Sequence, residues 1–366
     1  MPTACINQPD CRVSLCRERL EVRGRSKDSG DEELIREIPI RDLERLILVE
    51  STQITGAAMA ALLRAGIPVN YLGWNGHFLG GFLPAHNSHG LARLRQYERT
   101  RDPAFALAQA GRIITAKLYN QRRVLQRLLA SRQRRTQDPA TEPPPQPVQS
   151  SPEPPDNPAP GNPLGQVADT LTWLDHLFQP LSRSRAIDEL RGYEGTASAR
   201  YFQAWSSFLP EDFPFERRST RPPLNPVNAC ISFGATLLYQ EAVADIHAHG
   251  LDPALGLLHS TEDGRWSLAL DLIEPFRPAL VEALALDLFS HQILTKPHFE
   301  SRDGGVYLNE EGRRRFLLQY ERRMERQFLS EAVGHRTSLR LQLEHQAVMF
   351  KSALDRPEAF EPFLIN

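Results

Sequence analysis

The sequence has few cysteines, no extended hydrophobic run and no visible secretory signal, and each absence excludes a class of protein. Its 366 residues include four cysteines, none of them in a C-x-x-C arrangement, and the spacing of Cys5, Cys11 and Cys16 matches no common zinc site. No apolar stretch approaches the roughly 18 residues that a membrane-spanning helix needs. The first residues, MPTA, do not begin a basic segment followed by an apolar one. We therefore predict a cytoplasmic protein with reduced thiols and no membrane association.

Basic residues are missing from one segment and concentrated in another, although the net charge is only −2. Residues 91–135 contain twelve Lys or Arg and two acids. This balance is typical of a surface that binds a polyanion, and a solvated helix face is the alternative. Residues 136–165 contain no basic residue, four acids and eleven prolines. Such a composition cannot offset its ordering entropy, so we predict a disordered or polyproline-like insert.

Hydrophobic periodicity divides the rest of the chain into a β-rich beginning and a helical remainder. Apolar runs with strand character cover 19–24, 34–40 and 43–49. A helix is expected over 57–65, with Thr52 or Thr55 as its N-cap and Gly66 at its end.

Turn signals complete the division. Asn75-Gly76 lies between two apolar runs and predicts a hairpin. After Gly90 apolar residues recur at helical spacing, interrupted by the proline-rich stretch 214–228 and by a short hairpin at 303–305. We predict an α+β fold with a small N-terminal β-rich domain, residues 1–88, and a larger all-α catalytic domain, residues 89–366, that contains the insert.

Two acids occur inside a leucine-rich run, SLALDLIEPF. Asp271 and Glu274 share one face if residues 268–276 are helical. Buried like charges repel one another and require a cation between or beside them. The candidates are Arg277, which would make an ordinary ion pair, and a metal ion.

Two further residues could complete a metal site. His259 lies upstream of the turn at Asp263-Gly264, which can fold its imidazole back onto the acids. A histidine among carboxylates suits manganese or magnesium better than zinc, and a purely structural histidine is the alternative. Glu194 stands in LRGYEGTASARYF, where an Ala-rich helix is expected to begin. Its alternative role there is to complement the helix dipole.

Several motifs together resemble one family. In chain order they are LVESTQITGAAMAALLRAGIPVNYLGWNGHFLGGF, LYNQRRVLQR, LRGYEGTASARYF, RRSTRPPLNPVNACISFGATLLYQE, GLDPALGLLHSTEDGRWSLALDLIEPFRP and YLNEEGRRRFLLQYERRM. This set resembles the CRISPR-associated endonuclease and integrase of spacer acquisition, the first and universal CRISPR-associated protein. The resemblance covers nearly the whole chain apart from the proline-rich insert.

The resemblance implies a fold, a reaction and a site. It implies a β-domain followed by a helical catalytic domain, and a divalent metal held by Glu194, His259 and Glu274, with Asp271 as an accessory carboxylate. The metal would promote attack of a 3′-OH or of water on a phosphodiester, and His259 could protonate the leaving oxygen. For Asp271 we expect either orientation of the site or binding of a second metal.

The resemblance also implies partners. We expect a homodimer formed through the β-domain, a small ferredoxin-like adaptation protein, and double-stranded DNA from the incoming fragment and the repeat array. Basic residues expected to contact the DNA backbone are Arg93, Arg95, Arg112, Lys117, Arg122, Arg123, Arg217, Arg218, Arg221 and Arg277.

Two other functions remain open from the sequence. One is a stand-alone metal nuclease that acts on branched DNA in repair with the same residues. The other is a non-catalytic DNA-binding scaffold subunit, against which the complete set of Glu194, His259, Asp271 and Glu274 argues.

Overall fold

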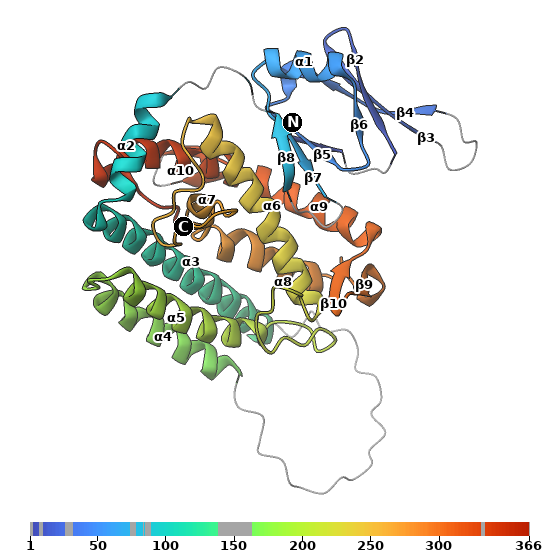
Figure 1. Cartoon of the computed structure of the whole chain (residues 1–366). Helices are drawn as coiled ribbons and strands as arrows, with labels where there is room; N and C mark the ends of the chain where they lie inside the picture. Colours follow the sequence, from blue (N-terminus) through green and yellow to red (C-terminus); the bar gives the residue numbers. More distant parts are fainter. Residues whose placement is uncertain are drawn as a thin grey trace, which may run out of the picture.

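The computed structural model describes residues 3–6, 10–25, 32–73, 78–82, 84, 89–137, 163–330 and 334–365. Strands occupy the first part of the chain, called here the β region (3–82), and helices dominate the second, called here the helical region (89–365) (Figure 1). This architecture confirms the predicted α+β class. None of the described helices combines the length and apolar content needed to span a bilayer.

The β region consists of two four-stranded sheets and one helix. One sheet contains, in spatial order, β1 (Thr3–Ile6), β5 (Arg45–Val49), β7 (Val69–Leu72) and β8 (Phe78–Phe82); the other contains β4 (Glu32–Pro39), β3 (Arg19–Arg25), β2 (Arg12–Cys16) and β6 (Gln53–Ile54). Apolar side chains from both sheets and from α1 (Gly56–Arg64) form one buried cluster. The three predicted strands are present as β3, β4 and β5, whereas β1 and β2 were not predicted.

Local signals define the helix and the hairpin of this region. Thr55 rather than Thr52 caps α1, because its hydroxyl accepts the N–H of Ala58 at 3.3 Å. Gly66 ends the helix with a φ of +78°, a value that glycine adopts without strain. Strands β7 and β8 pair antiparallel as the predicted hairpin requires. The turn itself, Asn75-Gly76, lies outside the described residues.

The helical region is built from long helices and two short hairpins. Its helices are α2 (Gly90–Thr100), α3 (Pro103–Gln137), α4 (Pro163–Ser182), α5 (Ile187–Ser206), α6 (Pro226–Ala248), α7 (Ser267–Ile273), the π-helical turn η3 (Pro278–Glu282), α8 (Ala283–Ser290), α9 (Glu310–Glu325) and α10 (Leu339–Ala353). The hairpins are β9 (Phe299–Arg302) with β10 (Gly305–Leu308), and β11 (Phe328–Ser330) with β12 (His335–Thr337). Single 3-10 turns are η1 (Ile40–Asp42), η4 (Lys296–His298) and η5 (Pro357–Ala359).

These elements confirm the predicted hairpin at 303–305. They differ from the sequence-based prediction in a second hairpin and in the ends of two helices. The hairpin at 303–305 is present as β9–β10, whereas β11–β12 was not predicted and makes the region largely rather than wholly helical. Helix α3 continues to Gln137 and α4 begins at Pro163, so both extend into the predicted insert. The remainder of the insert, 138–162, lies outside the described residues.

Helix α6 forms the centre of the helical region. Asn225 caps it by accepting the N–H of Asn228 at 2.8 Å, and Pro226 occupies the first turn, where a missing N–H costs nothing. Buried residues occupy almost every face of this helix, so its apolar pattern shows little periodicity. Helices α3 and α5 pack side by side, and α7 packs against α6 (Figure 1). Among the candidate site residues, Glu194 lies on α5 and Asp271 on α7, and α3 packs against both helices.

A buried group of charges, called here the junction cluster (Arg45, Glu241, Asp245 and Arg340), joins the β region to the helical region. Arg45 on β5 binds Glu241 on α6 at 3.2 Å and also pairs with Asp245 one turn later. Arg340 on α10 approaches Glu241 at 3.7 Å. The hydroxyl of Tyr320 donates to Glu241 at 3.0 Å. Arginine nitrogens from two elements thus surround carboxylates on a third.

Candidate metal centre

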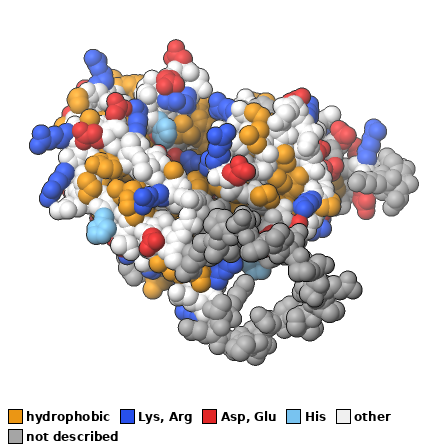
Figure 2. Space-filling view, turned by 90° about the horizontal axis from the view of Figure 1, so that it is seen from below, with side chains coloured by type: hydrophobic (Ala, Val, Ile, Leu, Met, Phe, Trp, Pro, Cys, Tyr) orange, Lys and Arg blue, Asp and Glu red, His pale blue; other side chains and the backbone are white. Residues whose placement is uncertain are grey.

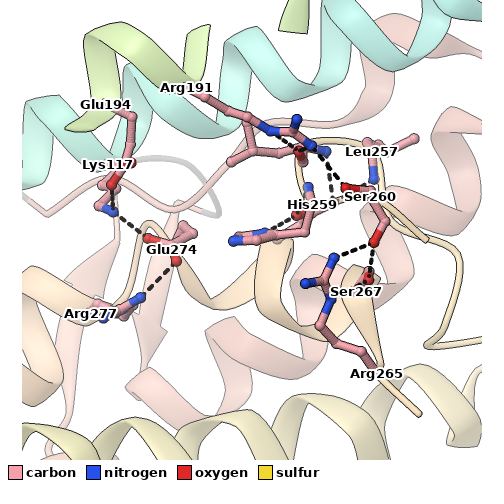
Figure 3. A network of polar contacts seen from close by, with 12 residues as sticks. Lys117, Arg191, Glu194, Leu257, His259, Ser260, Arg265, Ser267, Glu274 and Arg277 are labelled. Carbon is pink, nitrogen blue, oxygen red and sulfur yellow. Dashed lines mark hydrogen bonds and ion pairs between the residues drawn. The ribbon is translucent and has the colours of Figure 1, made fainter. Parts of the chain in front are cut away.

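Three elements bring two carboxylates and one ammonium group together (Figure 3). Lys117 on α3 pairs with Glu194 on α5, and its Nζ lies 2.5 Å from Oε2 of Glu274 at the end of α7. The second oxygen of Glu274 accepts a hydrogen bond from Nη1 of Arg277 at 2.8 Å. Lys117 is 5 % exposed and Glu274 is 4 % exposed. Of the two acids that the sequence predicted to need a cation, Glu274 has two, Lys117 and Arg277, and both belong to the chain.

Electrostatics keep Lys117, Glu274 and Arg277 ionised. Burial alone would raise the pKa of Glu274, but the charges of Arg277 and Lys117 outweigh it and lower that pKa to about 2. Burial alone would also lower the pKa of Lys117, and the charges of Glu274 and Glu194 raise it instead. Glu274 is therefore a carboxylate throughout the physiological pH range.

Asp271 lies behind His259 and fixes the orientation of its ring. It is fully buried, and its Oδ1 lies 2.6 Å from Nδ1 of His259. The same carboxylate accepts backbone N–H groups from Leu257 at 2.6 Å, Leu258 at 3.0 Å and His259 at 2.9 Å. With its oxygens engaged in this way, Asp271 positions the imidazole and leaves Nε2 directed toward the side on which Glu274 lies (Figure 3).

Close packing of the loop before α7 places His259. A Cβ on Gly256 would lie 2.3 Å from the carbonyl oxygen of His259, so only glycine fits there. Arg191 on α5 donates from Nε and Nη2 to the carbonyl of Leu258, at 2.9 and 2.6 Å. Arg191 thus connects the loop that carries His259 to α5, and Glu194 lies one turn after Arg191 on the same helix. Arg191 is not among the residues predicted from the sequence.

The donor set fits a divalent manganese or magnesium ion, although the groups do not yet surround one. In the described part of the chain, no three His, Cys, Asp or Glu side chains converge as they stand to enclose a metal. Lys117 lies between Glu194 and Glu274 instead. The buried Oε2 of Glu274 accepts no well-aligned hydrogen bond from any described residue. Manganese and magnesium accept ligands of this kind: the carboxylates of Glu194 and Glu274, and the imidazole of His259, whose Nδ1 binds Asp271.

Comparisons with known proteins identify the family of the chain. The family model described as CRISPR associated protein Cas1 matches residues 4–144 and 157–322. The chain belongs to the Cas1 family. A curated relative, the CRISPR-associated endonuclease Cas1 3 of Thermus thermophilus, is 29 % identical over 344 residues, which are 93 % of this chain and 91 % of the relative.

Solved structures share the Cas1 fold. A CAS1 protein from Thermotoga maritima superposes with a TM-score of 0.73 at 23 % identity, over 98 % of this chain and 99 % of that one. A casposase bound to an integration product gives 0.75 at 21 %, over 97 % and 90 %. A chain of a Cas6-RT-Cas1--Cas2 complex gives 0.73 at 24 %, over 99 % of this chain and 36 % of that longer chain.

Two of the residues predicted to contact DNA, Lys117 and Arg277, lie against the carboxylates of the candidate site. Lys117 is buried between Glu194 and Glu274, so its ammonium is not presented on the surface. Arg277 binds Glu274 behind the site. Carboxylates of the candidate site engage both side chains, and a contact of either one with DNA stays a prediction. The two cations compensate the charge of the site's carboxylates.

Other predicted DNA-contacting arginines are partly engaged within the protein. Arg95 pairs with Asp355, Arg122 with Asp175, Arg123 bonds to Gln126, Arg112 donates to the carbonyls of Glu358 and Phe360, and Arg218 donates to Asn228. Arg93 is half-buried, whereas Arg217 and Arg221 are exposed. These last three arginines make no ion pair with another described residue of the chain.

The position of Glu194 differs from the sequence-based alternative. Helix α5 begins at Ile187, about two turns before Glu194, so Glu194 does not complement the helix dipole. Its carboxylate instead accepts hydrogen bonds from Lys117 and, at 2.9 Å, from Ser198. Glu274 directly follows α7 and precedes Pro275, and its carboxylate meets Lys117 on α3.

Proposed function

We propose that this protein is a metal-dependent DNA endonuclease and integrase, which joins 3′-OH ends of short duplexes to phosphodiester bonds of a CRISPR array. One observation carries the proposal: Glu194 and Glu274 converge on one cation position beside an imidazole that a buried carboxylate orients. The Cas1 family membership supports the same reaction, and the relatives are named endonucleases.

The chain's own residues would prepare this reaction in three ways. Glu194 and Glu274 provide carboxylate oxygens, and Arg277 keeps Glu274 ionised. Asp271 holds His259 by Nδ1, so that Nε2 is available as a ligand. When bound, a manganese or magnesium ion would polarise the scissile phosphodiester and lower the pKa of the attacking hydroxyl.

The DNA path is proposed from the basic residues that remain accessible. Arg217 and Arg221 are exposed and lie in the loop before α6, the helix that packs against α7. Burial and the charge of Arg277 lower the pKa of Arg218 to about 10. Figure 2 shows a face on which Lys and Arg side chains are spread between hydrophobic patches and acids rather than gathered in one stripe. We therefore expect a few separate phosphate contacts whose affinity falls with salt.

Partners follow from the family. We propose that two copies dimerise through the β region and assemble with a small Cas2-type adaptation protein, as the composition of the Cas1–Cas2 structural neighbour suggests. We also propose a division of the chain into two domains at residue 88 and a cytoplasmic location.

Strand transfer tests the proposal. Wild type and Glu274→Ala would be incubated with a duplex bearing free 3′-OH ends, a plasmid carrying a repeat array and the small partner, with manganese or with EDTA. We expect manganese-dependent joining that falls by at least about a hundredfold in Glu274→Ala. Glu262→Ala is the matched control, because Glu262 is an exposed acid in the neighbouring loop that pairs only with Arg265 among the described residues.

The same assay separates the alternatives. DNA binding without joining or cleavage in manganese would contradict the proposal and indicate a scaffold. Cleavage of branched DNA without joining to the array would indicate a repair nuclease instead.

A further inference from the structure

Lys117 occupies the space in which the two acidic ligands meet. Its Nζ contacts Glu194 from one side and lies 2.5 Å from Glu274 Oε2 on the other (Figure 3). The side chain emerges from the middle of α3 among apolar neighbours such as Ile114 and Leu118, which are fully buried. The packing of these apolar neighbours on α3 therefore directs the lysine side chain toward the carboxylates.

Two positive groups cannot share this position. A divalent ion bound by Glu194 and Glu274 would take the oxygens that now face the ammonium, and at such short range the two cations would repel strongly. Lysine differs from arginine in this respect. Its ammonium is a compact point charge on a flexible four-carbon stem, so it can withdraw, whereas a guanidinium fork holds two acceptors in fixed geometry.

Charge balance also favours an exchange over simultaneous binding. Glu194 and Glu274 contribute two negative charges, and Lys117 and Arg277 contribute two positive ones. The described cluster is thus neutral without a metal. Arg277 approaches Glu274 through the other oxygen, Oε1, and among the described residues Oε2 has only Lys117 as an ion-pair partner. Oε2 is the atom without a well-aligned hydrogen bond.

We propose that Lys117 is an internal counter-ion that stabilises the metal-free site and must be displaced from Glu194 and Glu274 before a divalent ion binds. The inference rests on the proposed function, since it assumes that the metal binds between these carboxylates. Lys117 would then lower metal affinity and, without a metal, relieve the repulsion between the buried Glu274 and the half-buried Glu194.

Manganese binding without DNA tests this exchange. Lys117→Met removes the charge and keeps the length of the side chain, and Lys117→Gln keeps a hydrogen-bond donor in case the first variant folds poorly. Binding would be followed by the electron paramagnetic resonance signal of free manganese. We expect both variants to bind manganese at least about tenfold more tightly than wild type. In EDTA both should unfold at a lower temperature than wild type, and manganese should restore that loss.

Two controls separate the possible failures. Lys296→Met removes an exposed lysine that pairs with Asp212 and should leave manganese affinity unchanged. Glu274→Ala should lose binding. Equal or weaker manganese binding by both Lys117 variants, with binding still lost in Glu274→Ala, overturns the exchange and leaves the proposed metal site intact. Absence of manganese binding in wild type and in every variant overturns the metal site as well.

Discussion

The junction cluster and the candidate metal centre both bring opposite charges together inside the protein, but the cation shared by two carboxylates is an arginine in the first and a lysine in the second. In the junction cluster Arg45 reaches two carboxylates from two nitrogens, and Tyr320 donates a further hydrogen bond to Glu241. In the metal centre the single Nζ of Lys117 serves both Glu194 and Glu274. Arginine forks suit a permanent connection, whereas a lone ammonium occupies a position that another cation can take.

The two clusters also differ in the pKa values of their acids: the pKa of Asp245 is raised, and that of Glu274 is lowered. Burial raises the pKa of Asp245 to about 6, against the opposing charge of Arg45. At Glu274 burial is outweighed by Arg277 and Lys117, and the pKa falls to about 2. The candidate metal centre thus keeps Glu274 ionised, as a cation ligand requires, while in the junction cluster Asp245 titrates near pH 6. Burial alone does not distinguish a structural cluster from a functional one.

The largest expected effect separates the clusters by stability. Arg45→Leu leaves Glu241 and Asp245 buried without their main partner, and we expect the free energy of unfolding to fall by about 3–5 kcal/mol. Urea denaturation measures this loss. Arg41→Leu, at an exposed arginine two residues beyond β4, is the control and should change stability by less than about 1 kcal/mol. A similarly small loss in Arg45→Leu would show that the junction cluster does not hold the two regions together.

A smaller effect is expected from the carboxylate behind the histidine. Asp271→Asn presents an amide N–H₂ in place of one acceptor oxygen, so it cannot keep all of the bonds to Leu257, Leu258 and the imidazole of His259. We expect manganese affinity to fall about 10–100-fold, as for other residues that orient a metal ligand. Isothermal titration calorimetry measures the change, with Asp263→Asn in the exposed turn as control. Unchanged affinity would exclude the orienting role.

The smallest effect is a pH dependence that belongs to the junction cluster. The folded pKa of Asp245, about 6, lies above the ordinary value of 3.8, so the folded state holds this proton more tightly than the unfolded state. The resulting stability is complete below about pH 4 and is lost as the pH rises through about 6. We expect the free energy of unfolding to decrease by on the order of 1 kcal/mol between about pH 5 and about pH 8.

Comparison with Asp245→Asn isolates this contribution. The variant should show a weaker decrease over the same pH range in urea denaturation. A decrease equal to that of wild type would assign the pH dependence to other groups. Glu274 should contribute nothing there, because its folded pKa is depressed and its stabilising effect is lost only as the pH falls through about 2.

The sequence predicted the elements whose signals are local. Strands β3 to β5 follow from β-branched runs, α1 from Thr55 and Gly66, and the loop before α7 from Asp263-Gly264. Strand β1 could not be found in this way, because its four residues are stabilised by parallel pairing with β5, about forty residues away in the chain. The start of α5 was not found from the sequence, because its first turns are polar and no side chain caps the helix.

The candidate site was predicted in composition but not in arrangement. Spacing alone indicated that Asp271 and Glu274 need a cation, and the resemblance to the family named the ligands. Lys117 was taken for a phosphate contact because it lies in the basic segment. Its helical neighbours Ile113, Ile114 and Leu118 are all fully buried. Their apolar pattern was the available signal that this lysine points inward, and only the fold shows which carboxylates it meets.

The most direct test of the account is whether a histidine nitrogen coordinates the metal. Pulsed electron paramagnetic resonance of manganese bound to the wild-type protein should show coupling to a directly ligated imidazole nitrogen. The account predicts that this coupling disappears in His259→Gln and persists in His249→Gln, at a half-buried histidine that pairs with Glu344. A wild-type spectrum without nitrogen coupling, or one that survives in His259→Gln, would contradict a metal centre built from Glu194, His259 and Glu274.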